Sequence, residues 1–371
     1  MVKRPTILLL IPHLGGGGAE RVTALLSQGL SPQKYDLHLG LITQRNSGSE
    51  TLPPWVTVHG LGARRVRSAA IALVRLIRLL KPDVILSGMA HLNFLVLLLK
   101  PFLPFQTRIL IRQNGTVSSM LRSRDSSVLT RLLYRRLYRR ADRIVCQSTA
   151  MASDLAEQSG VDDSQLLVLP NPVDNETIRA VPRSAADHWP GLGPHLLAIG
   201  RLSHEKGFDL LLESFSSLRL KFPHADLTIV GTGPEAMSLK RMRDDLRLKN
   251  SVRFAGYVLH PEFYFPGATI FVLSSRHEGL PNALLEAAAA GMPIAALPAA
   301  QGIVDLLNGK PGTWVASEIS SKALTLSLIT ALQSLRPRQR FEHIWIEPYR
   351  MDRAILAYED LIDETLTGQL Q

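Results

Sequence analysis

Two short stretches, GRLSHEKG at residues 200–207 and RHEGLPNALLE at residues 276–286, decide how this chain folds. Each follows an apolar run typical of a buried strand, at residues 195–199 and 269–274, and each leads into a helical pattern. In an open α/β sheet, ligands bind just beyond the carboxyl ends of the strands. The sequence therefore predicts that both stretches reach the same edge of one sheet.

Two cations and two carboxylates of these stretches are candidates to bind a ligand. Arg201 offers a planar guanidinium and Lys206 a point charge, and both groups commonly bind phosphate oxygens. Pro281 suits the first turn of a helix, whose free amides would attract a phosphate. Glu278 and Glu286 would repel a phosphate, so we expect them to accept hydrogen bonds from sugar hydroxyls. A nucleoside diphosphate sugar has all of these features.

Each of these charged residues, taken singly, also has a simpler interpretation as a solvated surface charge. The alanine block at residues 287–290 favours burial of the neighbouring Glu286. A buried carboxylate without a partner is costly, so burial strengthens the functional interpretation of Glu286.

Four ordered motifs resemble those of the retaining glycosyltransferases of family 4. They are GRLSHEKGF at 200–208, VGTGPE at 230–235, FAGY at 254–257 and EGLPNALLEA at 278–287. The resemblance extends over nearly the whole chain and is weaker before residue 190. It implies the α/β GT-B fold, in which two Rossmann-like domains with doubly wound parallel sheets face a central cleft.

The resemblance also implies roles for individual residues. Arg201 and Lys206 would bind the donor diphosphate and stabilise the departing charge, Glu278 would hold the transferred sugar, and Glu286 the ribose. Backbone at residues 256–258 would receive the nucleobase. The donor-binding set implied in addition to Glu286 is Gly17, Gly18, Gly256, Tyr257, Val258, Leu280, Pro281, Asn282, Ala283 and Leu284.

The chain departs from the family pattern at two places. Many members carry a first-domain histidine near the sugar, and here the candidates for an acceptor or sugar site are His91, Arg112 and Asn114. The segment QGIVD at residues 301–305 replaces a frequent Gly-Gly-x-x-Glu motif. These departures concern the finer contacts to the donor and leave the reaction class unchanged.

A length of 371 residues predicts two domains, each with its own core. We expect an acceptor-binding domain at 1–175, a donor-binding domain at 190–345, and a C-terminal helix within 346–371 that packs back on the first domain. The single cysteine, Cys146, excludes an intramolecular disulfide and is typical of a reducing compartment. Without a recognisable signal peptide or an apolar run of about eighteen residues, the sequence predicts a cytoplasmic protein.

The formal net charge of +10 is concentrated in the first half of the chain. Residues 1–180 carry 23 Lys and Arg against 12 Asp and Glu, which favours an anionic partner. Eight arginines lie between residues 122 and 143, interleaved with leucines and tyrosines at helical spacing. Five of them are candidates to face a membrane, with the protein peripheral on the inner face of the plasma membrane: Arg131, Arg135, Arg136, Arg139 and Arg140.

Three interpretations of this basic segment remain open. A basic amphipathic helix can lie on an anionic bilayer. Alternatively, the apolar stripe can be the core face of an ordinary helix with its arginines in water. Nucleic-acid binding is the least favoured, because no recognised binding module surrounds the segment.

The alternation of apolar runs and helical patterns predicts the elements of both domains. In the first domain we expect strands at 7–11, 35–42, 57–61, 84–86, 109–112, 144–147 and 166–169 and helices at 19–30 and 69–80. In the second we expect strands at 195–199, 226–230, 252–254, 269–273 and 293–296 and helices at 207–221, 234–248 and 281–290. A linker at 175–193, a loop and strand at 302–314 and a last helix at 349–366 complete the prediction.

The sequence favours a transferase that needs no cofactor and no metal. The four glycines at residues 15–18 do not match the dinucleotide or Walker spacing, and neither an Asp-x-Asp site nor a cluster of His and Cys ligands is visible. We expect a nucleotide-sugar donor, a glycan or lipid-linked acceptor in surface polysaccharide synthesis, and no nucleic acid. The alternatives are an epimerase or phosphorylase of the same fold, an inactive sugar-nucleotide binder, and a basic nucleic-acid-binding protein.

Overall fold

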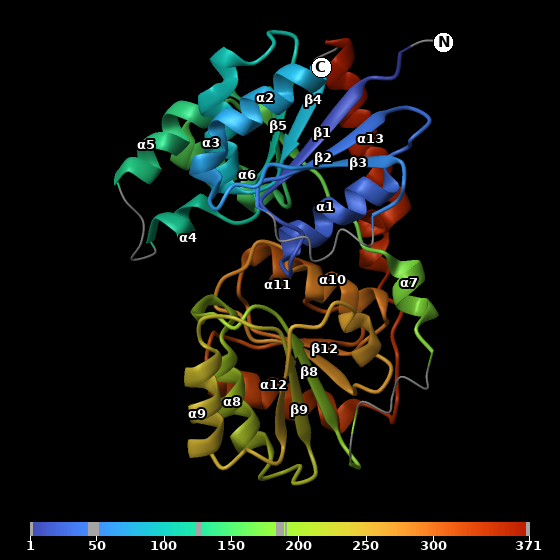
Figure 1. Ribbon diagram of the computed structural model, residues 1–371. Coiled ribbons are helices and arrows are strands. Elements are labelled where there is room, and N and C mark those ends of the chain that lie inside the picture. The colour runs from blue at the N-terminus through green and yellow to red at the C-terminus, as the bar shows by residue number, and fades with distance from the viewer. Residues whose placement is uncertain (1–2, 44–51, 123–127, 183–188, 190, 369–371) are drawn as a thin grey trace. The chain divides into compact units, whose positions relative to one another are not determined.

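The computed structural model describes residues 3–43, 52–122, 128–182, 189 and 191–368. The chain forms two compact units (Figure 1). The first unit comprises Met1–Pro172 and Tyr349–Gln371, and the second comprises Val173–Pro348. Each unit is built on one parallel sheet, as expected for the GT-B fold.

The sheet of the first unit has seven strands in the order β3-β2-β1-β4-β5-β6-β7. Its central strands are apolar and buried on both faces, which is typical of a parallel sheet covered by helices. The order reverses direction between β1 and β4, so their carboxyl ends form the switch point of this sheet. The strands are β1 Thr6–Ile11, β2 Asp36–Leu41, β3 Val56–Gly60, β4 Val84–Ser87, β5 Arg108–Arg112, β6 Arg143–Cys146 and β7 Leu166–Val168.

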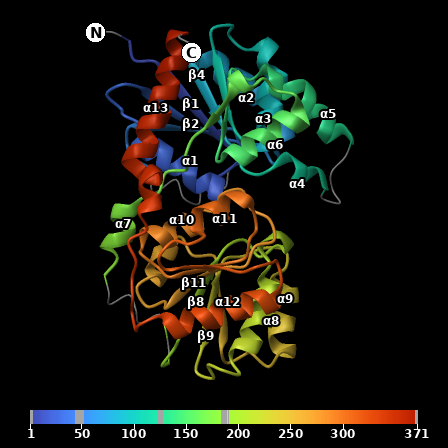
Figure 2. The same ribbon diagram turned by 180° about the vertical axis from the view of Figure 1, so that it is seen from behind.

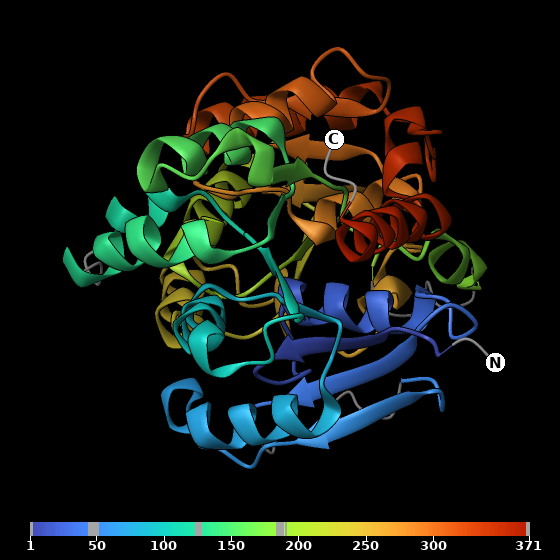
Figure 3. The same ribbon diagram turned by 90° about the horizontal axis from the view of Figure 1, so that it is seen from above.

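Helices cover both faces of this first sheet. Helices α2, α3, α5 and α6 pack on one face, while α1 and α13 pack on the other. Figure 3 shows α1 and α2 on opposite sides of the strands that carry the blue colours. The helices of the unit are α1 Gly18–Gly29, α2 Ala70–Leu80, α3 Ala90–Leu99, α4 Val117–Arg122, α5 Val128–Leu137, α6 Thr149–Ser159 and α13 Met351–Thr367.

The C-terminal helix α13 belongs to the first unit although the second unit precedes it in the chain. It lies beside α1, as Figure 2 shows. Lys34 Nζ lies 2.7 Å from Glu359 Oε2, and the Tyr35 hydroxyl donates a hydrogen bond of 2.6 Å to Asp363. Tyr358 is buried in the same core as β1 and β2. Helix α13 therefore closes one face of the first sheet.

The sheet of the second unit has six strands in the order β10-β9-β8-β11-β12-β13. All neighbouring strands pair in parallel, so every carboxyl end reaches the same edge. The switch point lies between β8 and β11. The strands are β8 His195–Ile199, β9 Asp226–Val230, β10 Val252–Gly256, β11 Ile270–Leu273, β12 Ile294–Ala296 and β13 Thr313–Val315.

The helices of the second unit again cover both faces. Helices α8, α9 and α12 share a core with alternate strand residues, and α10 contacts β11, β12 and α7. These helices are α7 Asn175–Ala180, α8 Phe208–Leu218, α9 Ala236–Asp245, α10 Asn282–Ala289, α11 Gln301–Leu307 and α12 Ser321–Ser334. Short 3-10 helices also occur, namely η2 Val66–Ala69, η3 Lys100–Phe102, η4 Tyr138–Arg140, η5 Asp163–Gln165, η7 His204–Lys206, η8 Pro261–Tyr264 and η9 Ile344–Tyr349.

The predicted strands match the structure within about two residues, and several helices were not predicted. Helices α3, α6 and α12 have no counterpart in the sequence prediction, and residues 301–307 form a helix where a loop was expected. The expected linker at 175–193 begins with helix α7, whose first turn is capped by Asp174. Residues 183–188 and 190 of that linker lie outside the described residues.

Candidate active site

The stretches at residues 200–207 and 276–286 follow β8 and β11, the two strands at the switch point of the second sheet. These strands are direct neighbours, with Ile270 paired to Leu196 and Phe271 to Leu197. The loop after β8 carries Arg201 and Lys206, and the loop after β11 carries Glu278. The prediction that both stretches reach one edge of one sheet is therefore confirmed.

The cation and the carboxylate nearest to each other are Lys206 and Glu278. Lys206 Nζ lies 2.5 Å from Glu278 Oε1, and both side chains are mostly buried. The Ser275 hydroxyl donates a hydrogen bond of 2.6 Å to the same carboxylate oxygen. The Arg201 side chain is exposed, so it can turn toward a ligand at this edge. Sequence analysis missed Ser275, although its position three residues before Glu278 is a possible signal.

Helix α10 presents its first amides at this same edge. Pro281 is the residue that caps the helix, with φ −74° and ψ 124°, so it lies one residue earlier than the predicted first turn. The helix starts at Asn282, and Ala283 and Leu284 follow in its first turn. Glu286 is only 5% exposed on the buried side of α10, as its alanine neighbours predicted. The first amides of a helix point toward its start, where the helix dipole is positive, so this end of α10 suits an anion.

Glycines allow the loops of the second unit to approach one another. Gly207 has φ +61°, and a Cβ there would collide with the carbonyl oxygen of Ser274. Gly231 has φ +140° and packs against the backbone of Gly200 in the same way. A Cβ at either position would force the backbones apart, so Gly207 fixes the spacing of the basic and acidic loops, and Gly231 fixes that of the loops after β8 and β9.

The predicted nucleobase segment lies at the end of the edge strand β10. Gly256 is the last residue of the strand, with φ +76°, and its carbonyl accepts a hydrogen bond of 2.7 Å from the Gly231 amide. Tyr257 is 48% exposed, and Val258 is partly buried. An exposed aromatic side chain beside open backbone suits stacking and hydrogen bonding by a planar base.

The glycine loop of the first unit lies at the switch point of its own sheet. Gly17 precedes α1, and a Cβ at Gly17 would collide with the buried carboxylate of Glu20. Gly18 is the first residue of α1, and His13 Nδ1 lies 3.7 Å from Glu20 Oε1. The loop therefore packs closely on the Glu20 carboxylate at the start of α1.

The three acceptor candidates of the first unit have different surroundings. His91 lies in the first turn of α3, after β4, and is exposed. Asn114 follows β5, donates a hydrogen bond to the carbonyl of Gly88 and accepts one of 3.4 Å from Gln147. Arg112 is only 2% exposed, and its side chain does not reach an open surface.

Arg112 instead joins three segments of the first unit. Its Nε donates a hydrogen bond of 2.9 Å to the Tyr358 hydroxyl on α13, and its Nη2 donates one of 2.6 Å to Asn171. These contacts tie the end of β5 to the C-terminal helix. They give Arg112 a structural role within the first unit, and its contact to acceptor or sugar stays a prediction.

The basic segment is divided between four elements and is not the single helix that the sequence predicted. Helix α4 ends at Arg122, α5 and η4 carry the five exposed arginines, and Arg143 opens β6, where it is 8% exposed. Arg124 lies outside the described residues. No helix among the described residues is long and apolar enough to cross a bilayer.

The apolar stripe of this segment divides in the same way. Tyr134, Leu137 and Tyr138 are buried in the core, whereas Leu129 is 60% and Leu132 is 48% exposed. In the second half of α5 the apolar stripe is therefore part of the core. In the first half of α5, leucines and arginines are exposed together on the surface.

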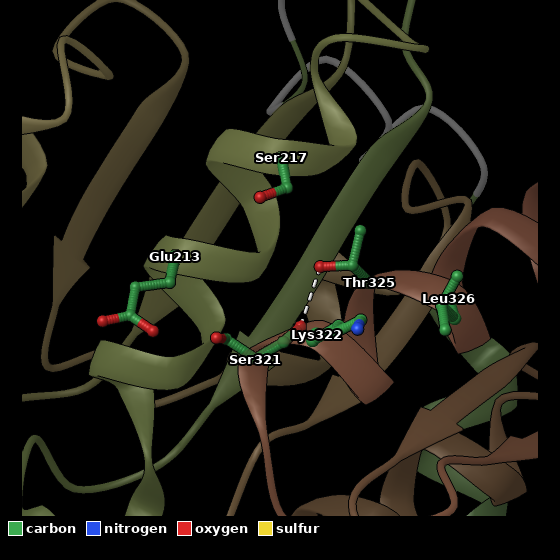
Figure 4. A pocket seen from close by; sticks show the side chains of 6 residues that line it. All are labelled: Glu213, Ser217, Ser321, Lys322, Thr325 and Leu326. Atoms are coloured by element: carbon green, nitrogen blue, oxygen red, sulfur yellow. Dashed lines mark hydrogen bonds between the residues drawn. The ribbon is translucent and has the colours of Figure 1, made fainter.

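A separate hollow of the second unit lies between α8 and α12 (Figure 4). It is lined by Glu213, Ser217, Ser321, Lys322, Thr325 and Leu326, and none of the candidate site residues contributes to it. Among the described residues, His, Cys, Asp and Glu side chains form no group of three or more that could hold a metal ion.

Two family models match the chain, one for each unit. The model described as Glycosyltransferase Family 4 matches residues 16–177, and the model described as Glycosyl transferases group 1 matches residues 187–344. The chain belongs to this family of glycosyltransferases. The family match agrees with the motifs at residues 200–208 and 278–287.

Several curated relatives carry glycosyltransferase names. The chain is 35% identical over 123 residues to an uncharacterised glycosyltransferase of Haemophilus influenzae, and 30% identical over 217 residues to the lipopolysaccharide core biosynthesis glycosyltransferase LpsE of Rhizobium meliloti. These matches cover 33% and 58% of this chain, but only 35% and 61% of the two relatives' lengths. The chain thus spans less than two thirds of these relatives.

One relative matches over most of its length. It is the N-acetylgalactosamine-N,N'-diacetylbacillosaminyl-diphospho-undecaprenol 4-alpha-N-acetylgalactosaminyltransferase of Campylobacter jejuni, 24% identical over 347 residues, 90% of this chain and 92% of that protein. Among solved structures, Anabaena Alr3699/HepE in complex with UDP and glucose superposes with a TM-score of 0.82 and 15% identity. That superposition covers 97% of this chain and 100% of the Anabaena chain, which supports the GT-B fold.

Proposed function

We propose that the protein is a retaining glycosyltransferase that moves a sugar from a nucleoside diphosphate sugar to a hydroxyl of a glycan or lipid-linked acceptor. The observation that carries this proposal is the meeting of Lys206 and Glu278, 2.5 Å apart, at the switch point of the second sheet. One group suits the phosphates of a sugar nucleotide and the other suits its hydroxyls. The family membership of the chain supports the same reaction class.

The donor diphosphate would bind to Arg201, Lys206 and the first amides of α10. Negative charge grows on the diphosphate as the bond to the sugar breaks, and fixed positive groups at that position lower the barrier. Charge neutralisation by two cations and a helix start would allow transfer without a metal ion. Lys206 would leave Glu278 for the phosphate, which frees the carboxylate for the hydroxyls of the transferred sugar.

The remaining donor contacts would come from the ends of β10 and α10. Glu286, buried on α10, would accept hydrogen bonds from the ribose, and backbone at residues 256–258 would receive the nucleobase. In solved structures of the same fold, Anabaena Alr3699/HepE is bound to UDP and to UDP-glucose. A uridine nucleotide is therefore the first donor to test.

The acceptor would bind at the carboxyl edge of the first sheet, where His91 and Asn114 lie. The Campylobacter jejuni relative is named for a diphospho-undecaprenol acceptor, and the Rhizobium meliloti relative for lipopolysaccharide core synthesis. Both names support a lipid-linked acceptor in surface polysaccharide synthesis. A cytoplasmic protein held at the inner face of the plasma membrane would meet such an acceptor.

Turnover with purified substrates tests this proposal. UDP-, GDP- and dTDP-sugars would be supplied with diphospho-undecaprenol glycans, and the anomeric configuration of the product read by NMR. Product formation with retention, lowered roughly a hundredfold or more in Lys206→Ala and Arg201→Ala at unchanged melting temperature, is the expected result. Full activity in both variants would refute the assignment of the two cations. Donor conversion without an acceptor would indicate an epimerase or phosphorylase instead.

A further inference from the structure

A second charged pair, next to Lys206 and Glu278, joins the loop after β11 to the start of α8. Arg276 Nη1 lies 2.7 Å from Asp209 Oδ1, and Arg276 Nη2 lies 2.6 Å from Asp209 Oδ2. Two parallel hydrogen bonds of this kind fix the orientation of both side chains as well as their distance. Asp209 lies in the first turn of α8, so the pair ties the loop after β11 to the start of that helix.

Backbone contacts strengthen this connection. Arg276 Nη1 donates a hydrogen bond of 3.0 Å to the carbonyl of His204, and the Arg276 amide donates one of 2.8 Å to the carbonyl of Glu205. The Ser274 hydroxyl donates one of 2.9 Å to the carbonyl of Lys206. The residues that flank Lys206 on its amino side are thus held by the residues that precede Glu278.

The charge states of the pair fit this arrangement. Burial would raise the pKa of Asp209, but the hydrogen bonds and the positive charge of Arg276 outweigh burial, and the pKa is lowered. The hydrogen bond from Arg276 to Asp209 in turn raises the pKa of the guanidinium. Both groups therefore stay charged across the working pH range of an enzyme.

The position of the pair suggests a role in aligning the site. Asp209 lies three residues after Lys206, and Arg276 lies two residues before Glu278. The pair therefore fixes the relative position of the groups expected to hold the diphosphate and the sugar. Errors of about 1 Å in such positions can lower the rate of an enzyme about a hundredfold.

We propose that Arg276 and Asp209 form a positioning clamp that aligns Lys206 with Glu278 for the transfer step. This inference rests on the proposed function, because the aligned groups are those assigned to the donor. Neither side chain of the clamp is assigned a contact with substrate. Global stability depends little on a partly exposed ion pair, since α8 is also anchored by Phe208 and other apolar residues in the core.

A double-mutant cycle tests the clamp. The variants are Asp209→Asn, which keeps the size of the residue, Arg276→Gln, which removes the charged guanidinium, and the double variant. The matched control is Glu213→Gln, which removes the same charge from an exposed position of the same helix, labelled in Figure 4. Melting temperature, UDP affinity by calorimetry, and kcat and KM for the donor would be measured for all five proteins.

If the clamp aligns the site, each single variant loses roughly thirtyfold in kcat/KM and about tenfold in UDP affinity at unchanged melting temperature. The double variant then equals the single variants, because either change removes the same pair. The Glu213→Gln control keeps the rate and the affinity of the unaltered protein.

Three outcomes would overturn the clamp. They are wild-type rates in the single variants, losses that multiply in the double variant, and losses that follow a fall in melting temperature. A separate outcome concerns the proposed function itself. Absence of both turnover and nucleotide binding in the unaltered protein, over the whole panel of donors, contradicts the function and the clamp together.

Discussion

Lys206 and Glu278 can pair with each other, or each can bind a donor molecule. Their separation of 2.5 Å neutralises both charges in the absence of ligand, and Ser275 holds the carboxylate in place. A diphosphate competes for the lysine, while sugar hydroxyls satisfy the carboxylate that it leaves. Buried charges remain paired both before and after binding, so the site does not require a costly unpaired charge in either state.

Substitution of Gly207 tests how closely the loop after β8 approaches the end of β11. A methyl group at this position meets the backbone of Ser274, whereas one at Gly309, which has a similar φ of +69°, meets nothing. Gly309→Ala should lower the free energy of unfolding by about 1 kcal/mol through backbone strain alone. Gly207→Ala should lower it by roughly 3 kcal/mol, because the two loops must also separate. Chemical denaturation of both variants measures the difference, and equal effects would contradict the close approach.

Cys146 should be unreactive in the folded protein. It is fully buried at the end of β6, and burial, with a smaller contribution from Asp154, raises its pKa to about 12. The thiolate is the reactive form, so an aromatic disulfide reagent at pH 8 should label the thiol only after denaturation.

The raised pKa of Cys146 also fixes the sign of a pH effect on stability. The unfolded chain loses the thiol proton near its ordinary pKa of about 8.5, whereas the folded protein keeps it up to about pH 12. This contribution to stability is therefore present below about pH 8.5 and is lost as pH rises toward 12. Rapid labelling of the native protein at pH 8 would contradict the burial.

At the scale of elements, the periodicity of apolar residues predicted the strands and the amphipathic helices. It did not predict helices that lack a polar face. Helix α3 reads AHLNFLVLLL and is apolar almost all round, because α2 and α5 pack on it. Such a sequence gives no contrast between faces, so it does not indicate a helix by its period. Helix α12 has the same difficulty, with small and apolar residues mixed along SKALTLSLITALQS.

Helix α5 provides the test of membrane attachment. Its first half combines exposed Leu129 and Leu132 with exposed arginines, which suits an anionic bilayer. Replacing Arg131, Arg135 and Arg136 with Gln should weaken binding to phosphatidylglycerol vesicles roughly a hundredfold, at about 1 kcal/mol for each cation. Sedimentation with these vesicles, and with neutral phosphatidylcholine vesicles, measures the effect.

A control of equal charge lies in the second unit. Replacing the exposed Lys240, Arg241 and Lys249 with Gln removes the same net charge from a different surface. If attachment depends on α5, this control binds the anionic vesicles as the unaltered protein does. Equal losses in both triple variants would indicate a general effect of net charge, and would contradict a membrane role of α5.

At the scale of the whole molecule, the same topology occurs twice. Each sheet reverses its strand order between two adjacent central strands, β1 and β4 in the first unit and β8 and β11 in the second. Because parallel strands all end at one edge, the order of strands and loops along the sequence is enough to bring Arg201, Lys206 and Glu278 together. The sequence could also locate the glycine loop at residues 15–18 in the first unit.

The pairings within the site could not be predicted in the same way. Lys206 bonds to a residue 72 positions away, and Arg276 to one 67 positions away. No local pattern records which side chains meet across two loops, so the pairing of Asp209 with Arg276 gave no signal in the sequence. Nor does a local pattern record the hydrogen bond from Arg112 to Tyr358, 246 positions away, or the burial of the Arg112 side chain.

Hydrogen–deuterium exchange with and without UDP, GDP or dTDP tests the central claim most directly. We expect one nucleotide to slow exchange in the second unit at residues 200–207, 231–235, 256–258 and 280–286, with exchange unchanged at the hollow between α8 and α12. Protection confined to that hollow, or no protection at these four segments with any of the nucleotides, would contradict the assignment of the donor site.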